Sequence, residues 1–375
     1  MINQKVLLKD ILFNQTKIEQ IANEIYLVHP SFKMADFIRD VVVAFPELEL
    51  KERISWISEC LNKYLPSDYR HTVSILVRAL PPPNNPTLTD NDFGDFIYAP
   101  YAEYIAKNGC TREYLQISFK ALYEITQRFS VENAIRYFIN AYPEEALHEL
   151  SKWATDSHYH VRRLCSEGTR PKLPWAQKIS IPVFASLTIL DELFFDKTRF
   201  VTRSVANHLN DISKVSPDLV IDTLKKWRKS NKQNQPEMEY ITHHALRTLI
   251  KNGHPKALQF IGLSHIVRVY VSQFVIPKKV NMNTSFEFSF VVLTKEDTDV
   301  IIDYILYFQN KSGKLNSKKV FKLKSISLKK NQPVAISKRH VLRQFMTTRT
   351  LYAGRHEIEL QINGKLQGKH IFELV

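Results

Sequence analysis

The fold is decided by two stretches, DSHYHVRRLCSEG (156–168) and DKTRFVTRSVANHLND (196–211), which align with a step of 40 residues. Three residue pairs match across that step: Asp156 with Asp196, Val161 with Val201, and Arg163 with Arg203. A further step reaches ITHHALRTLIKNG (241–253), and a step back reaches ALYEITQRF (121–129) with a looser match. A period of about 40 residues is typical of HEAT and armadillo helix pairs, which bury their apolar faces by stacking on their neighbours. The chain is therefore predicted to contain an α-solenoid of HEAT-like repeats.

Equivalent positions of stacked repeats form columns along one concave face. Two such columns are polar in otherwise apolar helices: 163/203/243 (Arg, Arg, His) and 167/207/247 (Glu, Asn, Arg). Polar columns are expected on the side of a solenoid that lines its groove.

The chain before these repeats also has a helical pattern, with apolar residues three and four positions apart. The stretches with this pattern are 5–13, 17–28, 34–45, 48–65, 69–80, 95–109 and 112–129. PPPNNP (81–86) interrupts them, because proline removes backbone donors, and it begins a loop that runs to about Asp95. We expect the solenoid to span residues 1–262.

The pattern changes near Leu263 to alternating and β-branched segments. Seven of them are separated by turn-forming residues: 265–276, 284–294, 299–309, 319–328, 333–338, 355–362 and 369–375. NGK (363–365) is a tight hairpin signal. Seven short strands in this length predict an immunoglobulin-like β-sandwich over residues 263–375, so the fold class is multidomain α and β.

The net charge of +14 indicates a polyanionic partner. Residues 266–375 hold 19 Lys and Arg against 8 Asp and Glu, whereas the first 265 residues hold 33 against 30. Between Tyr304 and His356 there are 13 basic residues and no acidic one. A charge run is often only a solvated surface, but a single-sign run of this length favours nucleic acid.

Several function classes lack their usual signals. The chain starts without the apolar core and cleavage site of a signal peptide, and no apolar stretch is long enough to span a membrane. Cys60, Cys110 and Cys165 are far apart, as expected of reduced core thiols in a cytoplasmic protein. There is no phosphate-binding glycine loop, no GxSxG and no HExxH. The histidines of DSHYH (156–160) and His243–His244 lack further ligands, so we expect no metal and no cofactor.

The segment SEGTRPKLPWA (166–176) ends one helix in an unusual way. Gly168 is a natural helix stop, and Pro171 and Pro174 prevent immediate continuation. Glu167 then lies in the last turn, where the helix dipole disfavours negative charge. The prolines stiffen an arm that presents Trp175, which reduces the entropy lost when this arm is ordered.

Three acidic residues lie in or beside successive repeats: Glu132 in SVENAIRYF, Glu167 in CSEG, and Asp211 in ANHLNDI. A stacked solenoid could place them on one concave wall. Each also has a local explanation, since Glu167 lies four residues after Arg163 and would form an ordinary helical ion pair worth roughly 0.2–0.5 kcal/mol. A lone tryptophan such as Trp175 is likewise often a packing residue. Spacing alone leaves both interpretations open.

Several longer stretches resemble the AlkC family of alkylation-repair DNA glycosylases. They are VRRLCSEGTRPKLPWA (161–176), VTRSVANHLNDISKVSPDLV (201–220), ALYEITQRFSVENAIRYF (121–138), FPELELKERI (45–54) and YAEYIAKNG (101–109). The resemblance covers nearly the whole chain, because some family members carry an immunoglobulin-like domain after the solenoid. Thr202 departs from it, since a second basic residue is expected there by analogy with Arg162 and Arg163.

The resemblance implies hydrolysis of the N-glycosidic bond of cationic alkylated bases in duplex DNA, 3-methyladenine and also 3-methylcytosine, with the base still largely stacked. It implies that the catalytic residues are Glu132, Glu167, Trp175 and Asp211, with Glu124 as the nearby alternative to Glu132. Basic residues around them would contact phosphates: Arg162, Arg163, Arg170, Lys172, Arg199 and Arg203. Lys318, Lys319, Lys322 and Lys324 would let the basic C-terminal domain clamp the DNA. We expect a monomer that acts in the bacterial cytosol and nucleoid.

Two alternatives remain open at this point. The first is a non-catalytic HEAT-repeat module that only binds nucleic acid or an acidic protein. The second is a glycosylase that acts mainly on cationic pyrimidines. Release of free methylated base separates the first alternative from the main hypothesis, and the identity of the released base separates the second.

Overall fold

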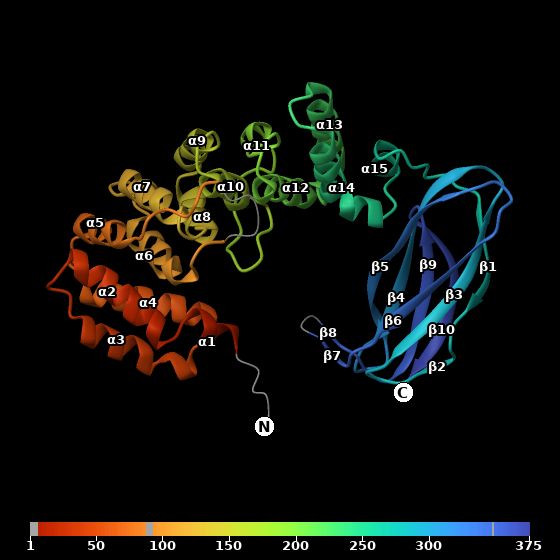
Figure 1. The fold of residues 1–375 in the computed structure, drawn as a ribbon, viewed down its shortest axis with the longest axis horizontal. Coiled ribbons are helices and arrows are strands. Elements are labelled where there is room, and N and C mark those ends of the chain that lie inside the picture. The colour runs from red at the N-terminus through yellow and green to blue at the C-terminus, as the bar shows by residue number, and fades with distance from the viewer. Residues whose placement is uncertain (1–6, 88–92, 347–348) are drawn as a thin grey trace. The chain divides into compact units, whose positions relative to one another are not determined.

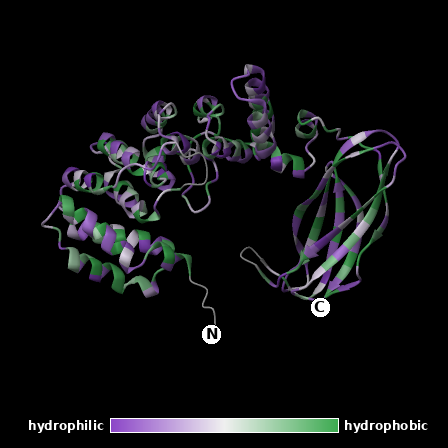
Figure 2. Cartoon of the chain, viewed as in Figure 1, coloured by the Kyte–Doolittle hydropathy of each residue, from purple (hydrophilic) through white to green (hydrophobic). Residues whose placement is uncertain are grey.

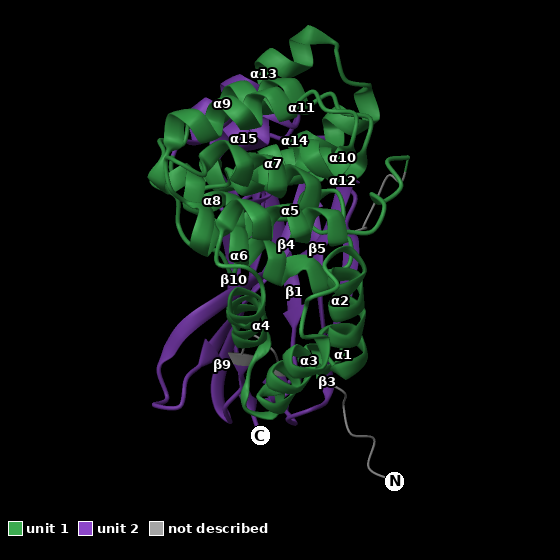
Figure 3. Cartoon of the chain, turned by 90° about the vertical axis from the view of Figure 1, so that its left-hand side faces the viewer, with its two compact units in different colours: residues 1–215, 224–245 green, residues 216–223, 246–375 purple. Residues whose placement is uncertain are grey.

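A computed structural model describes residues 7–87, 93–346 and 349–375. The chain divides into two compact units, which Figure 3 colours separately: residues 1–215 with 224–245, and residues 216–223 with 246–375. Helices form the first part of the chain and strands the last part (Figure 1). The predicted fold class, helical repeats followed by a β-sandwich, is confirmed.

The helical elements follow one another with short connections. In chain order they are α1 (Leu8–Leu12), α2 (Gln15–Val28), α3 (Met34–Val43), η1 (Phe45–Glu47), α4 (Leu50–Tyr64), α5 (Tyr69–Ala79), η2 (Phe96–Tyr98), α6 (Ala99–Gly109), α7 (Leu115–Thr126), α8 (Glu132–Ala141), α9 (Pro143–Trp153), α10 (Tyr159–Gly168), α11 (Leu187–Leu193), α12 (Arg199–Ser213), α13 (Pro217–Ser230), α14 (Gln235–Lys251) and α15 (Pro255–Phe260). The predicted helices agree with these bounds within a few residues. Two of the predicted stretches, the start of 5–13 and part of the loop 81–95, lie outside the described residues.

Helices of the first unit such as α2 and α12 bury one apolar face, and Figure 2 shows apolar and polar residues alternating along the helices, whereas the short α1 buries no residue. In α12 the fully buried residues Val201, Val205 and Leu209 recur every four positions, which places them on one side of the helix. Polar side chains begin some helices: Asp68 accepts a hydrogen bond from the backbone of His71 at the start of α5 (2.7 Å). Periodicity and capping together therefore account for the positions of these helices.

The predicted repeat is visible in how successive helices are tied together. Asp156 and Asp196 each accept a hydrogen bond from the backbone two residues later, at 2.7 Å in both cases. Each of these acids also binds a residue of the preceding repeat: the Tyr123 hydroxyl donates to Asp156 (2.9 Å), and Arg162 Nη2 donates to Asp196 Oδ1 (3.1 Å). The same kind of link joins Arg199 to Glu237 (2.8 Å). The repeat in the sequence thus corresponds to a repeated structural link.

The second unit is built mainly from strands. They are β1 (Val269–Val275), β2 (Lys279–Val280), β3 (Ser285–Thr294), β4 (Thr298–Gln309), β5 (Leu315–Leu328), β6 (Val334–Val341), β7 (Phe345–Met346), β8 (Arg349–Thr350), β9 (Gly354–Ile362) and β10 (Lys365–Leu374). All seven predicted strands are present, and the short β2, β7 and β8 are additional. Two sheets, in the orders β1-β3-β6 and β2-β10-β9-β4-β5, contribute to one core.

Aromatic residues fill the space between these two sheets. Phe288 of β3 packs edge-on against Tyr304 of β4, with ring centroids 5.0 Å apart, and Phe286 lies 5.1 Å from Phe372 of β10. The β9–β10 hairpin turns at Asn363 and Gly364, whose φ angles are 43° and 81°, as a two-residue primed turn requires. The hairpin predicted from NGK is therefore present.

The last helical residues of the second unit are fastened to this hairpin. Gly253 and Gly364 lie so close that a Cβ on Gly364 would come within 2.0 Å of the Gly253 Cα atom. Asn363 Nδ2 donates to the carbonyl of Ser264 (2.8 Å), and Gln361 Nε2 donates to the carbonyl of Lys251 (2.7 Å). The predicted boundary at residue 262 falls between α15 and β1, but this compact unit already includes residues 246–262. The domain boundary stays a prediction.

Three other expectations have mixed outcomes. Helix α10 ends at Gly168 as predicted, but Gly168 does not adopt a left-handed conformation. Glycine is needed there because a Cβ would meet the Ile135 side chain of α8 at 2.7 Å. Cys60 and Cys165 are core thiols, whereas Cys110 is only half-buried. Among the described residues, no helix combines the length and the hydrophobicity needed to cross a membrane.

Candidate active site

Two buried carboxylates are joined by one guanidinium in the first unit. Glu167, in the last turn of α10, is 6% exposed, and Asp211, in the last turn of α12, is 5% exposed. Arg170 donates from Nη1 to Glu167 Oε1 (2.6 Å) and from Nε to Asp211 Oδ2 (3.0 Å). Lys214 Nζ donates to Asp211 Oδ1 (2.9 Å). Two of the three predicted acids are therefore brought together.

The second oxygen of Glu167 is also held. The Ser204 hydroxyl donates to Glu167 Oε2 (2.5 Å), and Arg163 Nη2 lies 3.8 Å from the same oxygen. Burial by itself raises the pKa of Glu167, but the charges of Arg163 and Arg170 and the Ser204 hydrogen bond outweigh it. The net pKa lies below the ordinary value, so Glu167 is ionised at neutral pH.

We use the name carboxylate cluster for the group formed by Glu167, Asp211, Arg163 and Arg170. Glu132 lies at its edge, at the start of α8. Its Oε2 atom is 4.0 Å from Arg163 Nη1 and, among the described residues, this buried oxygen accepts no hydrogen bond. Arg163 Nη1 donates instead to the Ser130 hydroxyl (2.8 Å). The alternative acid, Glu124, pairs with Arg128 at 3.0 Å. Of the two, Glu132 is therefore the one that joins the cluster.

Trp175 lies on the arm that follows α10, and its side chain is 81% exposed. Its backbone has a φ of 71°, which is costly for a residue with a Cβ. Lys51 donates to the Trp175 carbonyl, and its Nζ lies 5.7 Å from the centre of the indole ring. The arm thus holds a large aromatic surface in solvent.

Comparison with known proteins covers the whole of this architecture. The family model described as a DNA alkylation repair enzyme matches residues 123–249, and the model of the C-terminal Ig-like domain of the uncharacterised protein YhaZ matches residues 270–375. The uncharacterized protein YhaZ of Bacillus subtilis (strain 168) is 31% identical over 374 residues, 98% of this chain and 99% of that protein. The solved alkylpurine DNA glycosylase AlkC of Pseudomonas fluorescens, bound to DNA containing an abasic site analog, is 32% identical, with a TM-score of 0.87 over 99% of this chain and 100% of that chain.

The chain belongs to the AlkC family of DNA alkylation repair proteins. The carboxylate cluster lies within the residues matched by the alkylation repair model, and β1–β10 lie almost entirely within those matched by the Ig-like model. The resemblance read from the sequence is therefore confirmed along nearly the full length of this AlkC-family chain.

Four arginines predicted to contact DNA have partners within this AlkC-family protein. Arg162 and Arg199 link successive repeats through Asp196 and Glu237. Arg170 bridges the two buried acids, and Arg163 lies over the ring of Phe200 at 4.4 Å. These guanidinium groups therefore make contacts within the protein, and their contacts with DNA phosphates stay predictions.

The remaining predicted cations lie at the surface or near it. Lys172 is exposed, and Arg203 is half-buried with its guanidinium 5.8 Å from the Phe200 ring. Lys318, Lys319, Lys322 and Lys324 are all exposed on β5, the outermost strand of the five-stranded sheet. The register places Lys318 opposite Tyr307 and Lys322 opposite Asp303, on one face, while Lys319 lies opposite Leu306 on the other. Their role in clamping DNA stays a prediction.

Several residues in or beside the cluster are not identifiable from local sequence patterns: Phe93, Arg136, Ser204 and Lys214. Phe93 is half-exposed; the Arg163 guanidinium lies over its ring at 5.3 Å, and the Phe93 and Phe200 ring centroids are 5.1 Å apart. Ser204 carries a usable signal, because the preceding repeat has Leu164 at the equivalent position and a buried hydroxyl replaces an apolar side chain there. Comparing the repeats position by position would have found it.

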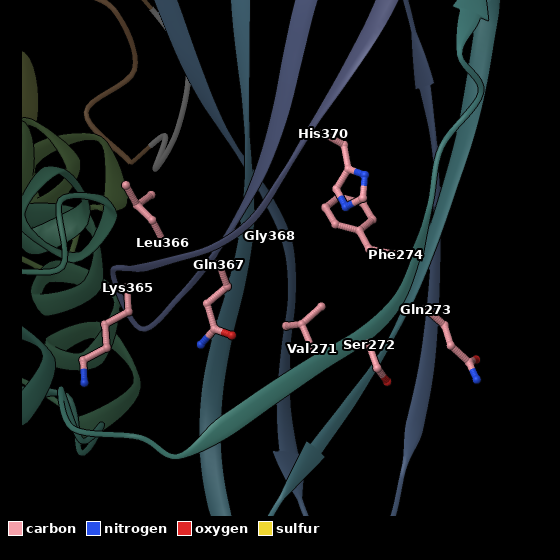
Figure 4. Close-up of a pocket in the computed structure, with 9 residues that line it drawn as sticks. All are labelled: Val271, Ser272, Gln273, Phe274, Lys365, Leu366, Gln367, Gly368 and His370. Carbon is pink, nitrogen blue, oxygen red and sulfur yellow. The ribbon is translucent and has the colours of Figure 1, made fainter.

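Other parts of the molecule offer different chemistry. In the described ranges, no group of three or more His, Cys, Asp or Glu residues is arranged to hold a metal ion. Where β1 passes β10, the second unit has a hollow lined by residues of these two strands, with the rings of Phe274 and His370 4.4 Å apart (Figure 4). The side chains that line this hollow include no carboxylate, so it does not offer the chemistry of the cluster.

Proposed function

We propose that this chain is a monofunctional DNA glycosylase of base excision repair, which hydrolyses the N-glycosidic bond of cationic alkylated bases in duplex DNA. We propose 3-methyladenine as its main substrate and 3-methylcytosine as a second. The observation that carries this proposal is the pair of buried, Arg170-bridged acids in a chain that aligns over its full length with a DNA-bound alkylpurine DNA glycosylase. We further propose that it acts as a monomer in the bacterial cytosol and nucleoid.

The chemistry suits a cationic leaving group. An N3-alkylated adenine already carries a positive charge, so its departure needs no general acid. The sugar becomes cationic as the bond breaks, and a carboxylate beside it stabilises that charge in the transition state. Glu167 is suited to this role because its lowered pKa keeps it ionised at neutral pH. The same low pKa makes it a weak base, which favours an electrostatic role over proton removal.

Glu132 is the best placed of the three acids to hold the attacking water. The oxygens of Glu167 and Asp211 already accept hydrogen bonds from Arg170, Ser204 and Lys214. Glu132 Oε2 accepts none from the described residues and has Arg163 4.0 Å away. The Glu132 side chain is 23% exposed, against 7% for Glu167 and 4% for Asp211, so it is the carboxylate that water reaches most easily. A water that donates to it would be oriented for attack on the sugar.

Trp175 would supply an aromatic surface for the cationic sugar or base. A cation over an indole face is stabilised by roughly 0.5–2 kcal/mol. We assign phosphate binding first to Lys172 and to the four exposed lysines of β5, because their ammonium groups are accessible without breaking a buried ion pair. Each phosphate contact releases counterions, so binding should weaken steeply as salt is added.

The test is base release from methylated duplex DNA. Duplex DNA treated with dimethyl sulfate is incubated with the protein, and free bases are identified by chromatography. We expect free 3-methyladenine and abasic sites that stay uncleaved until alkali is added. Binding without release would support the non-catalytic module instead. Release only from a duplex that contains 3-methylcytosine would support a glycosylase for cationic pyrimidines.

A further inference from the structure

One face of α8 carries three polar residues spaced by four: Glu132, Arg136 and Asn140. Residues four apart on a helix lie one above the other, so these side chains form a stripe. The first belongs to the candidate active site. The other two, Arg136 and Asn140, form hydrogen bonds with the segment that follows α10. This segment therefore lies beside α8 (Figure 1).

Arg136 is fully buried and holds the backbone of the arm at three points. Its Nη1 atom donates to the carbonyls of Gly168 (3.0 Å) and Arg170 (2.9 Å). Its Nε atom donates to the carbonyl of Gln177 (2.6 Å). Burying a guanidinium whose hydrogen bonds go to backbone carbonyls rather than to a carboxylate is expensive, and its Nη2 atom is left without a hydrogen-bond partner among the described residues. Such a costly arrangement calls for an explanation beyond ordinary packing.

Asn140 extends the same set of contacts by one helical turn. Its Nδ2 atom donates to the carbonyl of Lys178 (2.9 Å), and its Oδ1 atom accepts from the backbone of Ser180 (3.0 Å). Asn140 and Arg136 together therefore hold both ends of residues 168–180. We call this pair the α8 clamp.

Trp175 lies between the two held ends, and its backbone is strained. A φ of 71° is costly for tryptophan and persists only where the surrounding structure enforces it. The exposed side chain cannot enforce it, because it is mostly in solvent. The backbone contacts of Arg136 and Asn140, with that of Lys51 at the Trp175 carbonyl, supply the constraint.

We propose that Arg136 and Asn140 are positioning residues, which hold Trp175 and the Arg170 backbone in place for the reaction. This inference rests on the proposed function, in which Trp175 meets the substrate and Arg170 bridges the acids. The clamp itself touches neither the acids' oxygens nor the indole ring. It acts through the backbone of the arm.

The first test observes Trp175 in the free protein and needs no activity. The chain has 4 tryptophans, so protein labelled with 5-fluorotryptophan gives separate ¹⁹F resonances, and Trp175→Phe assigns one of them. We expect Asn140→Ala to shift or broaden the Trp175 resonance alone. Asn133→Ala, an exposed change on the same helix, should leave it unchanged. An unaltered Trp175 resonance in Asn140→Ala would overturn the proposal.

The second test is a double-mutant cycle on the rate of base release. Asn140→Ala should lower kcat/KM about three- to tenfold in the parent and less than twofold in a Trp175→Ala background, since it acts through Trp175. An equal loss in both backgrounds would contradict the proposal. If the ¹⁹F resonance responds but the parent releases no base, the clamp stands and the proposed function fails. Asn140→Ala is preferred because Arg136 variants risk unfolding, although Arg136→Lys should show a larger shift where it folds.

Discussion

Glu167 in the first unit and Asp303 in the second are buried to nearly the same extent, at 6% and 4% exposed, but their pKa values move in opposite directions. Burial raises the pKa of Asp303 to about 6, and the charges of Lys251 and Lys322 offset only part of that rise. For Glu167, two guanidinium groups and the Ser204 hydroxyl outweigh the same effect. The partners of a buried acid therefore decide its charge at neutral pH.

This difference distinguishes Glu167, an acid suited to catalysis, from Asp303, an acid whose burial destabilises the fold at neutral pH. Glu167 is kept charged at a helix end, where the dipole opposes it, by groups that bind both of its oxygens. Asp303 lies at an irregularity in the β4–β5 register, opposite Lys322 and beside Gln361 of β9. A charge kept at a costly position is a candidate for function, whereas the raised pKa of Asp303 means that burial penalises its charged form, which destabilises the fold at neutral pH.

The largest effect is expected from Asp211→Asn. This change removes the charge of the second bridged acid and keeps its shape, so single-turnover base release should fall by about 100- to 1,000-fold. The affinity for DNA should change little, because the acid faces Arg170 and Lys214 rather than solvent. Parallel measurement of release and of DNA binding checks both parts. A variant that releases base at the parental rate would show that Asp211 is only a structural partner of Arg170 and Lys214.

Asp303→Asn tests whether the buried acid of the second unit destabilises the fold, as its raised pKa implies. A folded-state pKa raised to about 6 means that the folded chain binds a proton more readily than the unfolded chain. The parent should therefore gain stability as pH falls from 7.5 through 6, and the gain should be complete below the unfolded pKa near 4. At pH 7.5 Asp303→Asn should stabilise the second unit by on the order of 2–3 kcal/mol.

Denaturant unfolding of both proteins across this pH range measures the effect. The difference between them should shrink toward pH 4.5. A constant difference would mean that the pKa of Asp303 is not raised. Base release by this variant should equal that of the parent, since Asp303 lies outside the proposed site.

The four exposed lysines of β5 test whether exposed charges, unlike the buried acids, affect DNA binding rather than base release. Replacing Lys318, Lys319, Lys322 and Lys324 with Gln should reduce the salt dependence of DNA binding, by a slope of roughly 0.9 for each lost phosphate contact. Single-turnover release at saturating protein should stay at the parental rate. Titrations at several salt concentrations provide the slopes. Unchanged slopes would remove these lysines from the DNA interface.

The smallest effects concern Trp175. Trp175→Ala and Trp175→Gly should both lower kcat/KM by roughly 2- to 30-fold, through loss of the aromatic surface. They should differ in stability, because glycine adopts a φ of 71° freely and alanine does not. We expect Trp175→Gly to be about 1 kcal/mol more stable than Trp175→Ala by denaturant unfolding. Equal stability would show that the arm relaxes when the indole is removed.

The sequence predicts the helices and the seven main strands because these follow local periodicity. The repeat in particular appears as matched residues 40 apart, and Asp156 and Asp196 make the same backbone hydrogen bond. The two-residue hairpin turn is also predictable from the sequence, since Asn363 and Gly364 both tolerate the positive φ angles that this turn requires. Elements as short as β2 carry no periodic signal of their own.

The partners of charged residues are not predictable in the same way. Arg162, Arg163, Arg170 and Arg199 look like a basic groove in the sequence, but each has a partner supplied by a distant part of the chain. The sequence pattern around α8 does not single out Arg136, which is fully buried and holds the backbone of the arm. Gly168 looks like a left-handed helix cap, and it is small because α8 approaches. These features depend on tertiary contacts that local patterns do not contain.

The most direct test of the account is single-turnover base release from methylated duplex DNA by the parent, Glu167→Gln and Asp303→Asn, measured side by side with DNA affinity. The three proteins differ only at buried acids. We expect the parent and Asp303→Asn to release 3-methyladenine at the same rate, and Glu167→Gln to release it at least 100-fold more slowly with similar affinity. No release by the parent, or equal release by Glu167→Gln, would contradict the claim that the bridged acids carry out the reaction.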